Sequence, residues 1–120
     1  MSGQYKLNSD WSVEEIEDTL EWGKYMGESD DRQLAVTVWP EGQWLSTVFL
    51  GLDHSFGGYV PILFETMAFG FDPEESEWSD NYCERYATAE EAVANHKELE
   101  KRITAILGEP KRATQKSPTT

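Results

Sequence analysis

Apolar residues recur at two spacings along this chain, and the spacing divides the chain into helical and extended segments. The sequence Ser12-Val13-Glu14-Glu15 has the form of a helix capping box, and Ile16 and Leu20 continue the spacing of Val13. This pattern predicts a helix from residue 13 to about residue 26. A second capping box, Thr88-Ala89-Glu90-Glu91, precedes another apolar face and predicts a helix over about 89–107. That face comprises Ala92, His96, Leu99, Ile103 and Ile106.

Between the two helices, β-branched and aromatic residues concentrate in short runs separated by turn residues. Residues 33–39 and 44–53 flank the sequence Pro40-Glu41-Gly42-Gln43, and together they predict a hairpin. Residues 60–69 predict a third strand, with a proline near its start, where a missing donor is tolerated. Residues 82–86 predict a short edge strand.

The order of these segments indicates an α+β fold. We expect a three- or four-stranded antiparallel sheet with two helices packed on one face, in the order α-β-β-β-(β)-α. The length of 120 residues fits one globular domain, which we place at residues 1–109. Residues 110–120 have almost no apolar content, so we expect them to form a flexible basic tail outside the fold.

Acidic residues dominate the charge of the chain and limit the classes of partner. The formal net charge is -13, and because residues 110–120 hold three bases and no acid, residues 1–109 carry -16. This charge argues against direct binding to nucleic acid. It favours a basic partner, which includes the nucleic-acid-binding face of another protein, while solubility is the alternative explanation.

The chain lacks the patterns of secreted and membrane proteins. Its longest apolar run is well short of the roughly 20 residues that cross a bilayer, and no basic amphipathic helix is predicted. The first ten residues do not have the pattern of a secretory signal, and the single cysteine, Cys83, cannot form an internal disulfide. We therefore expect a cytoplasmic protein that does not bind membranes.

The most apolar stretch, residues 46–69, contains the first candidates for chemistry. Asp53 and His54 lie where the second predicted strand ends and a glycine-rich link begins. In a functional interpretation, His54 is a general base or metal ligand that a carboxylate orients. In the structural interpretation, Asp53 caps the turn and His54 points to solvent.

Two further ionisable residues fall at positions that predict burial. Glu65 lies in the middle of the third predicted strand, on the face of Met67 and Phe69. It forms either a structural pair with a base such as Arg85 or a histidine, or part of a catalytic site. His96 lies on the apolar face of the second predicted helix, so it is either paired with a carboxylate such as Glu65 or a satisfied core residue.

The remaining motifs give no cofactor or metal site. Two histidines and one cysteine, without the short spacings of zinc motifs, do not supply a ligand set, and the chain has no nucleotide-binding or nucleophile-elbow glycine pattern. We expect no metal and no cofactor. The acidic neighbours of Cys83 raise the pKa of its thiol, which argues against an activated nucleophile.

An acidic stretch from residue 70 to residue 81 contains no base and predicts an exposed loop. Aromatic residues among carboxylates can bind a basic surface, so this stretch is a candidate partner-binding site. The alternative is a solvated loop whose aromatic rings fold back onto the core. The candidate partner-binding residues are Asp72, Glu74, Glu75, Glu77, Trp78 and Asp80.

Three segments, STVFLGLDHSFGG, PILFETMAFG and RYATAEEAVANH, carry a resemblance to a known group of proteins. In these segments the chain resembles a family of small proteins encoded by bacteriophages and prophages, over roughly residues 32–100. The resemblance implies expression in an infected or lysogenic bacterial cytoplasm, and it implies no activity and no catalytic residues. The acidic insert between Phe71 and Tyr82 and the basic tail look like additions of this chain.

Two functions are consistent with the sequence. The first is a protein-binding modulator of a host or defence factor, which uses its acidic surface and the exposed parts of residues 53–59. The second is a small enzyme or ligand-binding domain with a pocket at Asp53, His54, Glu65 and His96. The scarcity of catalytic groups favours the first. A homodimer is a further expectation, because both faces of the third predicted strand are apolar.

Overall fold

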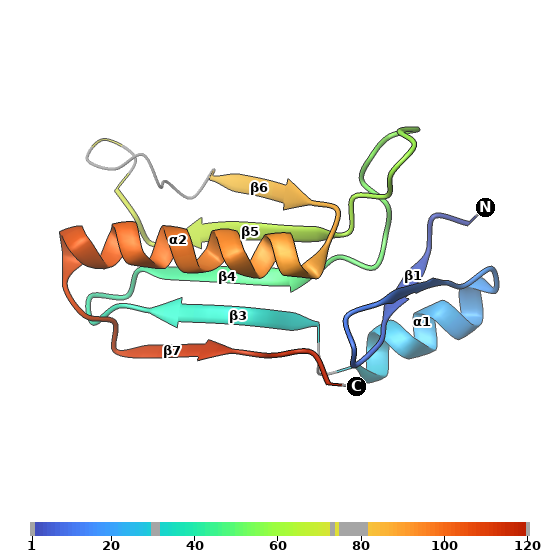
Figure 1. Cartoon of the computed structure of the whole chain (residues 1–120), viewed down its shortest axis with the longest axis horizontal. Helices are drawn as coiled ribbons and strands as arrows, with labels where there is room; N and C mark the ends of the chain where they lie inside the picture. The colour runs from blue at the N-terminus through green and yellow to red at the C-terminus, as the bar shows by residue number, and fades with distance from the viewer. Residues whose placement is uncertain (1, 30–31, 73, 75–81, 120) are drawn as a thin grey trace.

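A long helix crosses one face of an antiparallel sheet, and a smaller unit of two strands and a helix lies at one end of that sheet (Figure 1). The computed structural model describes residues 2–29, 32–72, 74 and 82–119. The elements are β1 (Tyr5–Leu7), β2 (Val13–Glu15), α1 (Thr19–Glu28), β3 (Gln33–Val38), β4 (Trp44–Phe49), β5 (Phe64–Phe69), β6 (Cys83–Tyr86), α2 (Ala89–Leu107) and β7 (Arg112–Gln115).

The main sheet has five antiparallel strands in the order β6-β5-β4-β3-β7, and β1 pairs with β2 in a separate two-stranded sheet. The fold is therefore α+β, as expected, but the sheet is larger than the predicted three or four strands. The two helices also do not share one face. Helix α2 covers the main sheet, whereas α1 lies beside β1 at the end of the molecule (Figure 1).

Alternation along the strands separates a covered face from an open face. In β5, the residues Phe64, Thr66 and Ala68 are fully buried beneath α2, whereas their neighbours are only half-buried, as the predicted alternation requires. On the opposite face, Trp44 and Phe69 stack with ring centroids 4.1 Å apart. This cross-strand pair partly shields the side of the sheet that α2 leaves uncovered.

Helix α2 confirms the prediction from its capping box. The Thr88 side chain accepts a hydrogen bond from the Glu91 N–H, and Gly108 ends the helix with a positive φ of 88°. The predicted apolar face is buried at four of its five positions, Ala92, His96, Leu99 and Ile103, whereas Ile106 is exposed. These residues pack α2 on the sheet.

The first predicted helix starts at the wrong residue. Residues 13–15 form strand β2, because residues 8–12 make a hairpin turn in which Asp10 accepts hydrogen bonds from both the N–H and the hydroxyl of Ser12. Ser12 therefore caps no helix. Asp18 does so instead, because its carboxylate accepts from the Leu20 and Glu21 N–H groups at 2.9 and 3.3 Å.

The C-terminal segment is part of the fold, which contradicts the expectation of a flexible tail over residues 110–120. Residues 112–115 form β7, which pairs with β3 from Ala35↔Gln115 to Val38↔Arg112. Further along, the Thr119 N–H donates to the Ser9 carbonyl at 2.8 Å. This hydrogen bond joins the C-terminal segment to the β1–β2 turn. The polar sequence of this segment hides its strand, because an edge strand with exposed side chains needs no apolar alternation.

Helix α1 docks on the loop after β4 through a glycine. The indole N–H of Trp22 donates to the Gly51 carbonyl at 3.1 Å. Gly51 has a positive φ of 80°, and a Cβ at this position would lie 2.6 Å from the sulfur of Met26. The missing side chain is thus what allows α1 to approach the loop.

Candidate functional site

The four residues of the predicted pocket do not form one site. Asp53 and His54 lie on the loop between β4 and β5, at the end of the sheet, and Glu65 lies on the face of β5 that points away from α2. His96 lies beneath α2 on the other face. Each has its own set of partners, so we describe them in turn.

Asp53 closes the loop that connects β4 to β5. Its carboxylate accepts hydrogen bonds from the N–H groups of Ser55 and Ile62 at 2.8 and 3.0 Å, and from the Ser55 hydroxyl at 2.9 Å. These bonds, above all that from Ile62, lower the pKa of Asp53, although partial burial opposes the shift. Asp53 therefore acts as a clasp that holds together the two ends of residues 53–62.

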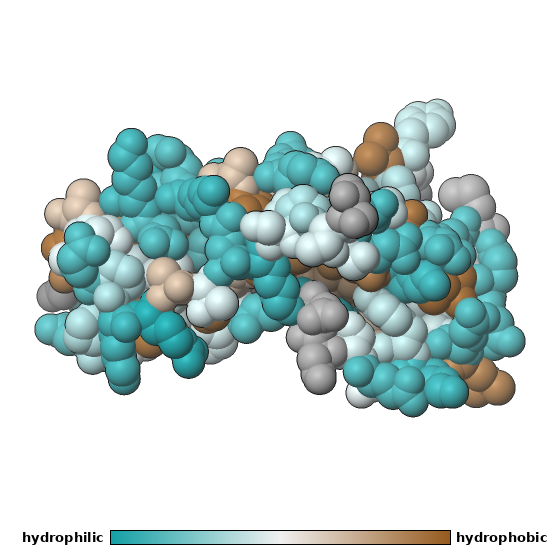
Figure 2. All heavy atoms as spheres, turned by 60° about the horizontal axis from the view of Figure 1, so that its bottom comes forward, coloured by the Kyte–Doolittle hydropathy of each residue, from teal (hydrophilic) through white to brown (hydrophobic). Residues whose placement is uncertain are grey.

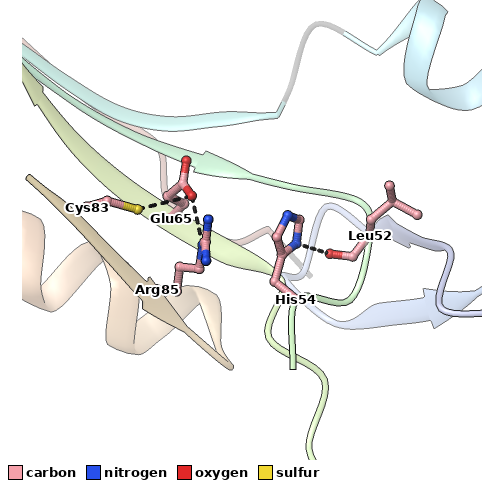
Figure 3. A network of polar contacts seen from close by, with 5 residues as sticks. All are labelled: Leu52, His54, Glu65, Cys83 and Arg85. Atoms are coloured by element: carbon pink, nitrogen blue, oxygen red, sulfur yellow. Dashed lines mark hydrogen bonds and ion pairs between the residues drawn. The ribbon is translucent and has the colours of Figure 1, made fainter. Parts of the chain in front are cut away.

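Among the described residues, no carboxylate hydrogen-bonds to His54 as a catalytic base would need. Its Nδ1–H donates to the Leu52 carbonyl at 2.8 Å (Figure 3). Its ring meets that of Phe56 edge-on, with centroids 6.5 Å apart. A carbonyl can only accept, so the proton on Nδ1 is fixed by this contact. The geometry supports the structural interpretation of Asp53, whereas His54 is half-buried and bonded to Leu52 and does not simply point to solvent.

The tip of this loop presents large apolar side chains to solvent. Phe56 is 89% exposed, Tyr59 is 106% exposed and Val60 is 59% exposed. The loop projects beyond the end of the sheet as the green segment of Figure 1. Phe56 also has a φ of +54°, which is uncommon for a residue other than glycine. The Asp53 clasp holds these side chains in the exposed position.

Glu65 forms the structural pair that the sequence predicts. It lies opposite Arg85 in the register of β5 and β6, and its Oε2 accepts from the Arg85 Nε–H at 2.9 Å and from the Cys83 thiol at 3.3 Å (Figure 3). Burial, followed by the hydrogen bond to Glu65, raises the pKa of the Cys83 thiol, in the direction expected. This thiol is a poor nucleophile at neutral pH.

His96 is a satisfied core residue, which is one of its two interpretations from the sequence, and its partners are hydroxyl groups and not a carboxylate such as Glu65. Its Nε2 lies 3.0 Å from the Thr37 hydroxyl, and its Nδ1 lies 2.7 Å from the Thr47 hydroxyl. The network continues from Thr47 to Thr66 at 2.6 Å and from Thr37 to the Glu100 carboxylate at 2.8 Å.

The direction of every hydrogen bond in this network follows from Glu100. Because Thr37 donates its hydroxyl proton to the carboxylate, its oxygen must accept from His96 Nε2–H. Nδ1 is then unprotonated and accepts from the Thr47 hydroxyl, which in turn accepts from Thr66. Burial lowers the pKa of His96 to about 4, so the ring is neutral at pH 7. The network fixes α2 to three strands.

Sequence reasoning missed the three threonines, because threonine is common in strands and its spacing carries no sign of a polar network. It expected the exposed parts of residues 53–59 to bind a partner, but it did not identify which side chains of this loop are exposed, namely Phe56, Tyr59 and Val60. A signal for the latter was present: three large apolar residues in five positions, interrupted by Gly57 and Gly58, fit no buried strand.

The candidate acidic stretch is described only in part. Asp72 and Glu74 are exposed, and the Asp72 carboxylate accepts from the Glu74 N–H at 2.9 Å. Glu75, Glu77, Trp78 and Asp80 lie outside the described residues. A second acidic region lies in residues 10–28, which hold seven acids and one base. Of these acids, Glu14 forms an ion pair, at 3.8 Å with Lys6.

The described residues contain no group of three or more His, Cys, Asp and Glu side chains placed to bind a metal ion. Nor does any helix in the described ranges combine the length and apolar character needed to cross a membrane. A shallow groove of about 380 Å³ lies between α2 and β7, and another of about 300 Å³ lies between β1 and the C-terminal segment.

No protein-family model, no curated protein and no solved structure matches the chain. The resemblance to bacteriophage and prophage proteins therefore stays a prediction from the three sequence segments.

Proposed function

We propose that the chain is a protein-binding modulator, and that it engages a basic surface of a host or defence factor through the end of the molecule that carries the loop of residues 53–62. The observation that carries this proposal is the exposure of Phe56 and Tyr59 at the tip of that loop. Aromatic side chains at this level of exposure are typical anchors of protein interfaces.

The loop is already organised for binding. The Asp53 clasp and the Gly58 N–H, which donates to the Ser55 carbonyl at 3.3 Å, tie the loop to itself. A segment held in one conformation loses less conformational entropy when a partner covers it. Burial of one aromatic side chain contributes about 1.5–3 kcal/mol, so two anchors are sufficient to dominate a small interface.

The charge around the loop supports a basic partner. Strand β2 and helix α1 lie at the same end of the molecule as the loop (Figure 1) and carry most of the seven acids of residues 10–28. Leu20, on α1, is 85% exposed among them. The pKa of the Tyr5 phenol is raised, mainly by burial and then by the negative charges of Glu15 and Asp53. Such a surface attracts bases over a distance set by the ionic strength.

The acidic stretch belongs to the same proposal through its sequence. Asp72, Glu74, Glu75, Glu77, Trp78 and Asp80 add carboxylates and one aromatic ring that would suit a basic partner.

The proposal is tested by capture of partners from a lysate of the bacterial host, with the immobilised chain and a variant that combines Phe56→Ala with Tyr59→Ala. We expect the chain to retain a basic protein and the variant to lose it, because truncation of an interface anchor costs about 2 kcal/mol or more. Both side chains are exposed, so the melting temperature should not change.

Ile106→Ala is the matched control, since Ile106 is an exposed apolar residue of α2, 68% exposed, near the opposite end of the sheet. It should leave capture intact. Retention should also weaken as salt increases, because salt screens the acidic surface. Equal capture by the loop variant, or retention that does not depend on salt, would argue against the proposal.

A further inference from the structure

The bases of this acidic chain are concentrated in one short segment. Residues 97–116 hold six of the ten Lys and Arg residues and three of the 23 Asp and Glu residues, so this segment has a formal charge of +3 and the rest of the chain has -16. The segment comprises the C-terminal half of α2 and the edge strand β7. The protein is thus strongly bipolar.

The groove of about 380 Å³ lies between these two elements. Lys97 and Lys101 line it from α2, one helical turn apart, and Ala113 and Gln115 line it from β7. Lys111 and Arg112 are exposed at the start of β7, and among the described residues no ion pair neutralises these four bases. Two acids, Glu100 and Glu109, also line the groove, and the Thr37 hydroxyl donates to one oxygen of Glu100. The four bases therefore exceed the acids at this edge by two.

The backbone of β7 has a free outer edge. The Lys116 N–H donates to the Leu34 carbonyl at 2.8 Å, and this bond continues the register in which Thr114 lies opposite Val36. In an antiparallel pair, residues point their N–H and C=O groups alternately toward and away from the partner strand. Just before β7, the Lys111 N–H also donates to β3, at 2.7 Å to the Val38 carbonyl. From Arg112 onward the even-numbered residues face β3, and Ala113 and Gln115 direct their backbone groups outward. No described strand lies on that side.

We propose that this outer edge of β7 and the groove beside α2 bind an extended acidic segment of a partner protein by strand addition. The docked strand would pair with the backbone of Ala113 and Gln115. Its side chains on the α2 side would lie beside Lys97 and Lys101, and those on the other side beside Arg112. Lys97, Lys101, Lys111 and Arg112 outnumber Glu100 and Glu109 around this edge, so carboxylates on the incoming strand are favoured.

Charge and hydrogen-bonding chemistry decide between occupants. A nucleic acid would not supply the alternating donors and acceptors that a strand edge needs, and the net charge of -13 repels it. A second β7 would bring Lys111 and Arg112 of both copies to one edge, and bases on edge strands oppose such pairing. The face in Figure 2, which brings the β7 side forward, is mostly hydrophilic, with hydrophobic residues in small separate groups. A charged segment suits it better than an apolar one.

The test uses an acetylated octapeptide of alternating glutamate and threonine, with binding measured by fluorescence anisotropy. We expect the full chain to bind this peptide and to bind neither its lysine counterpart nor a single-stranded oligonucleotide of similar charge. Two further peptides carry N-methyl groups at either the odd or the even positions. One of them should not bind and the other should bind normally, because only one of the two sets of peptide N–H groups faces β7. This experiment does not involve the loop of residues 53–62, so it can fail while the proposed function holds.

Variants of the chain separate the contribution of the β7 backbone to peptide binding from that of the basic side chains. Ala113→Pro removes an N–H that faces outward, so the fold should persist while peptide binding falls roughly tenfold or more. Thr114→Pro removes an N–H that faces β3 and should lower the melting temperature instead. The double variant Lys97→Glu/Lys101→Glu should weaken binding by a similar factor, and Lys24→Glu, on α1, is its matched control.

Three results would overturn the proposal. The first is no binding of the glutamate peptide, or equal binding of the oligonucleotide. The second is a peptide affinity that Ala113→Pro leaves unchanged. The third is a dimer in analytical ultracentrifugation that Ala113→Pro converts to a monomer, because the edge would then be occupied by a second copy of the chain.

Discussion

At the scale of single residues, His96 shows how a titratable group is held neutral inside this fold. Helix α2 carries it to the sheet, where Thr37 and Thr47 bond to both ring nitrogens and Glu100 sets the direction of the bonds. Helical periodicity is sufficient to predict that His96 is buried. It cannot predict its partners, because they come from two strands that are 49 and 59 residues away in the chain.

We expect the stability of the protein to depend on pH through His96. The folded state holds its pKa at about 4, whereas the ordinary value is 6.5, so between these values the unfolded chain binds an additional proton. The contribution of neutral His96 to the free energy of unfolding should be fully present above about pH 7. The free energy of unfolding should then fall by about 2 kcal/mol as the pH is lowered to about 5. Denaturant unfolding as a function of pH measures this slope.

His96→Gln is the control for this prediction, because an amide can still bond to the threonines but does not titrate. Its slope between about pH 5 and 7 should be much flatter. Asp10, Glu15 and Asp53 have lowered pKa values, so their contributions are lost only at more acidic pH, and they do not account for a slope in this range. The same steep slope in both proteins would contradict the assignment.

The tautomer of His96 is a second prediction at this scale. Because Thr37 donates to Glu100, the proton should reside on Nε2, and Nδ1 should be unprotonated. Long-range ¹H–¹⁵N correlation spectra at neutral pH distinguish the two nitrogens. A protonated Nδ1 would mean that the network runs in the opposite direction.

At the scale of elements, local signals predict what local contacts determine. The capping box at Thr88 gives α2 its start, and the turn at residues 40–43 joins β3 to β4 as predicted. The capping box at Ser12 does not start a helix. Ser12 hydrogen-bonds to Asp10 in a turn, and the residues after it pair with β1 as strand β2. Strand β7 is not predicted, because its only strand partner among the described elements, β3, is about 78 residues away in sequence and its side chains are polar.

The docking of α1 gives a prediction for two glycines. Gly51→Ala should destabilise the protein by more than about 1 kcal/mol, because alanine would have to adopt the positive φ of 80° and the end of the Met26 side chain would have to move away from the new Cβ. Gly23→Ala is the matched control within α1, where nothing lies within 4 Å of an added Cβ. It should stabilise the protein by about 0.5–1 kcal/mol, the usual preference of a helix for alanine. Thermal unfolding compares the two, and a neutral Gly51→Ala would contradict the described contact.

At the scale of the whole molecule, the fold places opposite charges at different sites. The loop of residues 53–62, β2 and α1 make an acidic end with exposed aromatic residues, while the second half of α2 and β7 make a basic edge. The composition predicts the acidity, but the separation depends on the pairing of β7 with β3. The Glu65–Arg85 pair could be predicted from the sequence. The proposed pocket of Asp53, His54, Glu65 and His96 could not be tested there, because the sequence does not show which face of the sheet each residue occupies.

Amide hydrogen exchange can show whether the loop end of the molecule binds a partner. The chain is measured alone and in complex with the purified protein that it captures. If the loop end binds the partner, exchange should slow on binding in residues 53–62 and in α1 and should stay unchanged in α2. A stable complex in which residues 53–62 exchange as fast as in the free chain would contradict it.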